Sequence, residues 1–105
     1  MKKQIIYIAH PISGDVNENL KSIKNIYRYL SLKNKVIPFI PYIATIESLN
    51  DNNQKERLIG FSHNEAIFKS GIIDQLWLYG GIISEGMKIE IEWANDLGIP
   101  IITKF

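Results

Sequence analysis

The stretch from residue 73 to residue 105, IDQLWLYGGIISEGMKIEIEWANDLGIPIITKF, changes its hydrophobic pattern twice. Residues 73–81 form a nearly continuous apolar run that ends in a glycine pair, which is typical of a buried strand. Residues 84–98 carry apolar side chains at helical spacing, with Ser84 in the position of an N-cap and Gly98 just after the end. The closing IPIITKF is again strand-like, so this stretch predicts strand, helix, strand.

The same alternation extends toward the N-terminus. QIIYIA is a β-branched and aromatic run bounded by His-Pro, as expected for a buried strand, and the segment after it has apolar residues at helical spacing. In order, we expect a strand at 4–9, a helix within 11–32, a strand at 35–41, a loop or short helix at 42–52 and a helix at 54–70.

Strands that are apolar along nearly their whole length and alternate with helices favour a parallel sheet covered on both faces. We therefore predict one α/β domain over residues 1–105, with a three-layer, flavodoxin-like or Rossmann-like sheet of four to five strands. Right-handed crossovers place the C-terminal ends of the strands at one edge, where ligands bind in such sheets. Three segments should meet there, namely residues 10–15, 38–41 and 79–86.

Composition limits the possible functions. The chain has 105 residues and a formal net charge of +1, which gives no electrostatic reason to expect nucleic-acid or membrane binding. It has no cysteine, which excludes disulfides and thiol catalysis. The apolar run before His10 is too short for a signal peptide, so we expect a soluble, cytoplasmic protein. A solvated helix face is the interpretation for the clustered basic residues Lys21, Lys24, Arg28, Lys33 and Lys35.

Three glutamates interrupt the segment ISEGMKIEIEWA, which otherwise has the pattern of a buried helix. With Met87 at zero on a helical wheel, the apolar side chains span an arc from about 240° to about 40°. Glu90 lies at about 300°, between Leu97 and Ala94, whereas Glu92 lies at about 140° among polar residues. Glu90 is therefore the glutamate that does not fit a solvated face.

A carboxylate on a core-facing stripe is costly unless it is paired or opens onto a cavity. Glu90 is in the second turn of its helix, close to the predicted ligand edge, so a pocket there is one explanation. The other is that its side chain reaches the surface or pairs with a lysine. Glu85 lies in the first turn, where a negative charge suits the helix dipole.

Two motifs resemble a known family. They are IYIAHPISG near the N-terminus and D-x-L-W-L-Y-G-x-x-x-S-x-G-M-x-x-E-x-x-x-A-x-x-x-G-I-P near the C-terminus. Together they are similar to the nucleoside 2-deoxyribosyltransferase superfamily, which includes 2′-deoxynucleoside 5′-monophosphate N-glycosidases. Residues 42–70 match only loosely. The resemblance implies cleavage of an N-glycosidic bond without a metal or cofactor, and assembly into a homo-oligomer.

The resemblance also implies roles for individual residues. The motif glutamate, here Glu90, is the nucleophile that attacks C1′ of the sugar, which suits a reaction through an oxocarbenium-like state. The tyrosine of the first strand, here Tyr7, lies beside the nucleophile in the family. The alternative for Tyr7 is a core aromatic residue whose hydroxyl lies at the end of the sheet.

Further positions are implied as substrate contacts. The family's monophosphate hydrolases have serine where the nucleoside transferases have aspartate, so Ser84 favours a nucleotide bound at the helix N-terminus. Ser84 as a plain N-cap is compatible with this. Gly86 would let the ligand approach the backbone, and Met87 belongs to the same motif. Ser13 and Gly14 occupy the loop that touches phosphate in the hydrolases.

The chain departs from the family at several positions. Where the hydrolases have an arginine after the first strand, this chain has none. Phosphate binding would then rest on the helix dipole and on hydroxyl groups, with His10 as a candidate further contact. The alternative for His10 is a capped loop histidine. His63 is the only other histidine, and we expect no metal site. The family's acidic residue before the third strand aligns with Ala66, so Asn64 or Glu65 would have to replace it. The family's segment beyond the last strand, which enters the neighbouring subunit's site, is expected to be absent or supplied from elsewhere.

These observations leave two functional classes open. The first is an enzyme that cleaves the N-glycosidic bond of a (deoxy)nucleoside 5′-monophosphate, by hydrolysis or by transfer. The second is a protein that binds a nucleotide without chemistry, as a sensor or sequestering protein. In a homo-oligomer, Trp77, Tyr79 and Trp93 are candidates for an apolar contact, although core burial explains Trp77 more simply.

Overall fold

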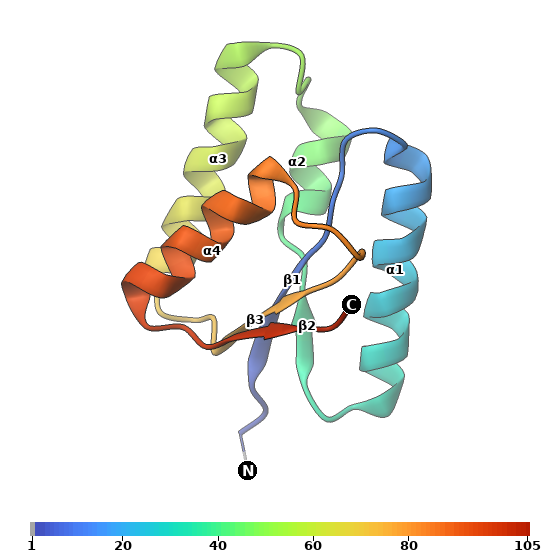
Figure 1. The fold of residues 1–105 in the computed structure, drawn as a ribbon, viewed down its shortest axis with the longest axis vertical. Coiled ribbons are helices and arrows are strands. Elements are labelled where there is room, and N and C mark those ends of the chain that lie inside the picture. Colours follow the sequence, from blue (N-terminus) through green and yellow to red (C-terminus); the bar gives the residue numbers. More distant parts are fainter. Residues whose placement is uncertain (1) are drawn as a thin grey trace.

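The computed structural model of this protein describes residues 2–105, which form four strands and four helices (Figure 1). The elements alternate as predicted, and the segment at 42–52 contains a short helix. Within residues 2–105, no helix combines the length and the apolar character needed to span a membrane. In chain order the elements are β1 (Ile5–Ala9), α1 (Val16–Lys33), β2 (Ile37–Phe39), α2 (Tyr42–Ser48), α3 (Gln54–Lys69), β3 (Gln75–Leu78), α4 (Glu85–Leu97) and β4 (Ile101–Thr103).

The four strands form one parallel sheet in the order β2-β1-β3-β4. In β1, Tyr7 is in register with Phe39 of β2 and Leu76 of β3. The chain leaves β1 to one side for β2 and returns to the other side for β3 and β4, so the strand order reverses beside β1. The predicted parallel α/β fold is confirmed, and its switch point lies between β1 and β3.

Helices cover both faces of this sheet (Figure 1). On one face Ile6 and Ile8 pack with Leu30 of α1. On the other face Tyr7 and Ala9 join a larger cluster with side chains from α2, α3 and α4. These four β1 residues are fully buried, which explains why β1 is apolar at successive positions rather than at alternate ones.

Helix α4 begins and ends where its sequence predicts. The Ser84 hydroxyl accepts a hydrogen bond from the Met87 N–H at 3.3 Å, and Gly98 ends the helix in the left-handed region at φ 71°. Glu92 is exposed, as expected. The prediction for Leu97 was wrong, because it is 45% exposed rather than part of the apolar face. It is the last residue of α4, where the chain already turns toward β4.

The aromatic residues expected at an oligomer contact all pack within the chain. Trp77 and Tyr79 pack against the cluster beneath α1, and the Lys104 ammonium lies 4.2 Å from the centre of the Trp77 ring. Trp93 packs on Phe68 of α3 with 5.5 Å between ring centroids. Core packing, the simpler explanation for Trp77, is therefore sufficient for all three.

The loops that follow β1 and β3 are in direct contact at Gly80. Its φ is +98°, and a Cβ added there would lie 2.4 Å from Cδ of Pro11. A side chain at this position would therefore meet both backbone strain and a steric clash. Gly80 thus allows the two loops at the ligand edge to lie against each other.

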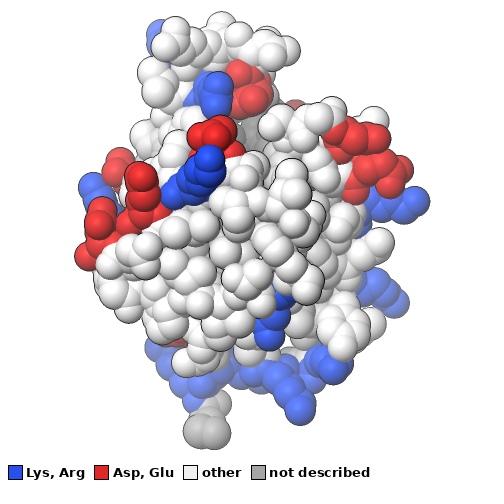
Figure 2. Space-filling model, viewed as in Figure 1, with Lys and Arg blue, Asp and Glu red and all other residues white. Residues whose placement is uncertain are grey.

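Charged side chains are distributed unevenly over the surface. The five basic residues of the predicted solvated face are exposed, and Lys24 pairs with Glu47 of α2 at 3.7 Å. Figure 2 shows many Lys and Arg side chains at the lower end, near the N-terminus, whereas Asp and Glu lie mainly in the upper half. In Figure 1, β1 and β3 point toward that upper half, so the edge at their C-terminal ends is not the basic end of the molecule.

Candidate active site

A cavity of about 510 Å³ lies beyond the C-terminal ends of β1 and β3. Two of the three segments predicted to meet there line it, the loop after β1 and the start of α4. The third, residues 38–41, does not, because the chain after β2 enters α2, and α2 with the start of α3 closes that side. Seven of the predicted site residues line the cavity: His10, Ser13, Gly14, Ser84, Gly86, Met87 and Glu90.

Glu90 faces this cavity from the second turn of α4. The eighth predicted residue, Tyr7, lies behind it in β1 and donates its O–H to Oε2 of Glu90. Tyr7 is fully buried, and its ring centroid lies 4.7 Å from that of Phe68 and 5.7 Å from that of Tyr42. The donor is therefore held in place by aromatic packing, and it fixes the orientation of the carboxylate.

Burial controls the protonation of this pair. Burial raises the pKa of Glu90 from 4.5 to about 7, and the hydrogen bond from Tyr7 lowers it in part. Burial, followed by the nearby Glu90 charge, raises the pKa of Tyr7 well above its ordinary value. Tyr7 therefore keeps its proton and remains a donor, while Glu90 changes between acid and carboxylate near neutral pH.

The start of α4 forms the part of the wall next to Glu90, and we call Ser84, Gly86, Met87 and Glu90 the α4 wall. The Ser84 hydroxyl is engaged as N-cap but still lines the cavity. A Cβ added to Gly86 would meet nothing within 4 Å, so a ligand has room to approach the backbone there. Met87 is buried and anchors the helix in the core.

Hydrogen bonds from nearby side chains stabilise the loop after β1. The side-chain amide of Asn19 donates to the carbonyl of Ile12 at 2.9 Å, and Gly14 has φ +95°. Ser13 and Gly14 are exposed on the cavity. His10 is buried, and its Nδ1 and Nε2 lie 2.7 Å from the Pro11 carbonyl and 3.0 Å from the Ser22 hydroxyl. Both ring nitrogens thus have partners in the protein, the arrangement of a structural loop histidine.

One known family matches the sequence over nearly its whole length. A family model described as "Domain of unknown function (DUF7768)" matches residues 4–104. The chain belongs to this family. The matched region includes β1, its loop and α4, and therefore the whole cavity. No curated protein matches the sequence significantly.

The opposite side of the cavity in this DUF7768 domain was not predicted from the sequence. We call it the α2–α3 wall, and it comprises Tyr42, Thr45, Ile46, Leu49, Asn50, Asp51, Asn52, Glu56, Arg57, Gly60, Phe61 and Asn64. Of the proposed replacements for the family's acidic residue, Asn64 lines the cavity, whereas Glu65 pairs with Lys69 at 3.5 Å. The aligned Ala66 is exposed and does not line the cavity.

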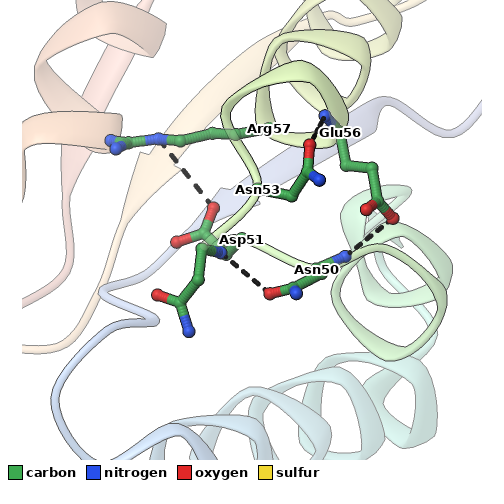
Figure 3. Close-up of polar contacts among 6 residues, drawn as sticks. Asn50, Asp51, Asn53, Glu56 and Arg57 are labelled. Carbon is green, nitrogen blue, oxygen red and sulfur yellow. Dashed lines mark hydrogen bonds and ion pairs between the residues drawn. The ribbon is translucent and has the colours of Figure 1, made fainter.

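Hydrogen bonds shape the corner of the α2–α3 wall (Figure 3). Asn53 caps α3 by accepting from the Glu56 N–H at 3.1 Å, and the Glu56 carboxylate accepts from the Asn50 N–H at 3.2 Å. Arg57 and Asp51 lie at the edge of this corner, with 3.9 Å between Nε and Oδ1. The N-x-x-E pattern at residues 53–56 is the sequence signal that marks this helix start.

Proposed function

We propose that this protein cleaves the N-glycosidic bond of a (deoxy)nucleoside 5′-monophosphate, by hydrolysis or transfer, with Glu90 as nucleophile. The observation that carries the proposal is the Glu90 carboxylate, which lies on an apolar helix face, opens onto the cavity and accepts a hydrogen bond from buried Tyr7. The resemblance to the nucleoside 2-deoxyribosyltransferase superfamily, found at the same residues, supports the same chemistry.

The reaction would proceed in two steps. A Glu90 carboxylate oxygen forms a bond to C1′ while the C1′–N bond breaks, and the electron pair of that bond leaves with the base, which takes up a proton from solvent. Water, or the nitrogen of a second base, then bonds to C1′ and releases a proton to solvent, while the bond between C1′ and Glu90 breaks and its electron pair returns to the Glu90 carboxylate. Water gives hydrolysis, whereas a second base gives transfer.

Tyr7 is a positioning residue in this scheme. Its O–H holds one carboxylate oxygen of Glu90 and leaves the other free for attack. Because only the carboxylate attacks, the rate should rise as the pH increases through about 7, the pKa of Glu90. The cavity would hold the sugar beside Glu90, with Ser13, Gly14, Ser84 and Gly86 as further substrate contacts.

The test is release of free base from a panel of ribo- and deoxyribonucleoside 5′-monophosphates by wild type, Glu90→Gln and Glu92→Gln. Glu92 is exposed on the same helix and provides the matched control. We expect at least one substrate to be cleaved by wild type and Glu92→Gln but not by Glu90→Gln. Equal base release by Glu90→Gln and wild type would overturn the proposal.

A nucleotide-binding protein without chemistry is the second candidate. It is favoured by the departures from the superfamily at the site, above all the absence of an arginine from residues 10–15, the loop after β1. This candidate predicts that a monophosphate binds to wild type without releasing base, even at pH 8.5, where Glu90 is ionised. Base release at that pH would exclude it.

We also propose that the protein acts as a cytoplasmic homo-oligomer, as the resemblance implies. Its mass in solution, measured by light scattering over a range of concentrations, tests the assembly. A mass equal to 12.1 kDa, that of a single chain, at all concentrations would contradict it.

A further inference from the structure

The cavity has one cationic side chain. Among the described residues that line it, Arg57 is the only lysine or arginine, whereas the carboxylates are Asp51, Glu56 and Glu90. Many other basic side chains lie at the opposite end of the molecule (Figure 2). An anionic group that enters the cavity therefore finds its positive partner at Arg57.

The guanidinium of Arg57 has N–H donors that its protein contacts do not engage. Its contacts within residues 2–105 are the ion pair with Asp51 at 3.9 Å and the Phe61 ring, whose centroid lies 5.5 Å away. The Arg57 and Asp51 side chains are 52% and 80% exposed, so the pair is long and well solvated and contributes little stability. Figure 3 shows Arg57 extended away from α3 with Asp51 beside it.

The remaining carboxylates of the cavity are engaged elsewhere. Glu56 accepts a hydrogen bond from the Asn50 N–H, and Glu90 accepts one from Tyr7. Asp51 is therefore the acid that competes with an incoming anion for Arg57. A phosphate group would offer the guanidinium a doubly charged partner and two parallel hydrogen bonds, a better match than the distant, exposed carboxylate.

We propose that Arg57 is the phosphate receptor of the cavity and that it exchanges its ion pair with Asp51 for the 5′-phosphate of a nucleotide. The inference rests on the proposed function for its ligand class, a nucleoside 5′-monophosphate. It adds a recognition residue on the α2–α3 wall to the substrate contacts offered by the α4 wall and by the loop after β1.

Calorimetric binding to full-length Glu90→Gln protein, which separates recognition from turnover, tests the proposal. The probes are a nucleoside 5′-monophosphate, the matching nucleoside, 2-deoxyribose 5-phosphate and inorganic phosphate. We expect the monophosphate to bind tighter than the nucleoside by about tenfold or more, as one charge-assisted contact provides. An Arg57→Gln substitution should remove most of that preference and leave nucleoside binding unchanged.

Two further variants sharpen the result. Lys55→Gln alters a lysine of the same helix outside this cavity and should keep the preference. Asp51→Asn removes the competing carboxylate and should tighten monophosphate binding. Preference for the sugar phosphate over inorganic phosphate identifies a nucleotide site rather than a general anion site.

Some outcomes would overturn the proposal. They are an unchanged phosphate preference in Arg57→Gln, an equal loss of nucleoside and nucleotide binding, or no binding of any phosphate probe. Failure of the proposed function is distinguishable, because Arg57-dependent binding without base release by wild type would retain the receptor and reject the enzyme. Base release by wild type, together with an unaltered phosphate preference in Arg57→Gln, would retain the enzyme and reject the receptor.

Discussion

The two walls of the cavity are built in opposite ways. On the α4 wall, the carboxylate of Glu90 is held by Tyr7, a side chain with no exposed surface. On the α2–α3 wall, Asp51 and Arg57 form an ion pair in which both side chains are more than half exposed. The first arrangement fixes one group in a low-dielectric site, and the second leaves two groups free to exchange partners. If the proposed functions hold, the residue that carries out the chemistry is held rigidly, whereas the residue that recognises the ligand can change partners.

The difference follows from where the residues come from in the chain. Tyr7 and Glu90 are 83 positions apart and meet only because β1 and α4 pack in one core. Asp51 lies in the turn between α2 and α3, and Arg57 lies in the first turn of α3, only six positions later. Substitutions of Tyr7 and Glu90 should therefore have large effects on stability and rate, whereas substitutions of Asp51 and Arg57 should affect binding alone.

The largest expected effect is the pH dependence of stability that Glu90 introduces. The pKa of Glu90 is raised to about 7 in the folded protein. Between pH 4.5 and 7 the folded state therefore holds a proton that the unfolded state has lost, so wild-type stability falls as the pH rises through this window and is level above it. The loss reaches about 3 kcal/mol at most.

Glu90→Gln has no such proton and should not show this loss. Urea unfolding of both proteins at pH 5 and pH 8 measures the effect, and Glu92→Gln, exposed on the same helix, is the control. We expect Glu90→Gln to gain stability relative to wild type between the two pH values. A pH dependence that is equal in the two proteins would show that Glu90 is not buried as a carboxylate.

The next largest effect concerns Tyr7, the hydrogen-bond donor to Glu90. Tyr7→Phe removes the hydrogen bond that lowers the pKa of Glu90, so this pKa should rise above about 7 and the ascending limb of the rate profile should move to higher pH. At neutral pH, base release should fall roughly 10- to 100-fold, as expected for one hydrogen bond to a charged group.

Tyr42→Phe is the matched control for this substitution. Tyr42 also has a buried ring, but its O–H donates to the Ile8 carbonyl rather than to Glu90. It should lower stability without moving the pH profile. If both variants shift the profile equally, the effect of Tyr7 is not specific to its bond with Glu90.

A backbone substitution at the ligand edge should have an intermediate effect. Gly80→Ala adds a Cβ 2.4 Å from Cδ of Pro11 at a φ of +98°. It should cost about 2 kcal/mol or more in unfolding free energy, from strain together with the clash. Gly81→Ala, at φ +81° with open space around its Cβ, isolates the strain and should cost about 1 kcal/mol. Equal losses in thermal unfolding would show that the two loops separate readily.

The smallest effect is expected on the exposed corner. Asp51→Asn breaks an ion pair that is long and solvated, so the unfolding free energy should change by less than about 0.5 kcal/mol. Denaturant unfolding at low and high salt measures this. A loss above about 1 kcal/mol would mean that the pair is a structural contact, and the distinction between the two walls would weaken.

The sequence was sufficient to predict the parallel fold and the α4 wall. Both depend on signals that are strong over short distances, namely apolar strands, the Ser84 cap and the Gly98 end. Glu90 was identified because a carboxylate on an apolar helix face is expensive, and that cost is visible in a helical wheel. The bond from Tyr7 is consistent with this position.

The α2–α3 wall could not be predicted in the same way. Its polar residues around Asn50 and Arg57 have no periodicity that separates them from an ordinary surface loop, and their position depends on how α3 packs against α4. The prediction for Leu97 was wrong for a related reason. A helical wheel extends the apolar face to the last residue of the helix, but the rest of the protein no longer covers that residue.

The most direct test of the central claim is to look for the covalent intermediate. Wild-type protein turning over its best monophosphate would be quenched rapidly in acid, digested and mapped by mass spectrometry. We predict an added deoxyribosyl or ribosyl phosphate on Glu90, absent from Glu90→Gln and retained in Glu92→Gln. An adduct on a different residue, or base release by Glu90→Gln at the wild-type rate with no adduct at position 90, would contradict the assignment of Glu90 as nucleophile.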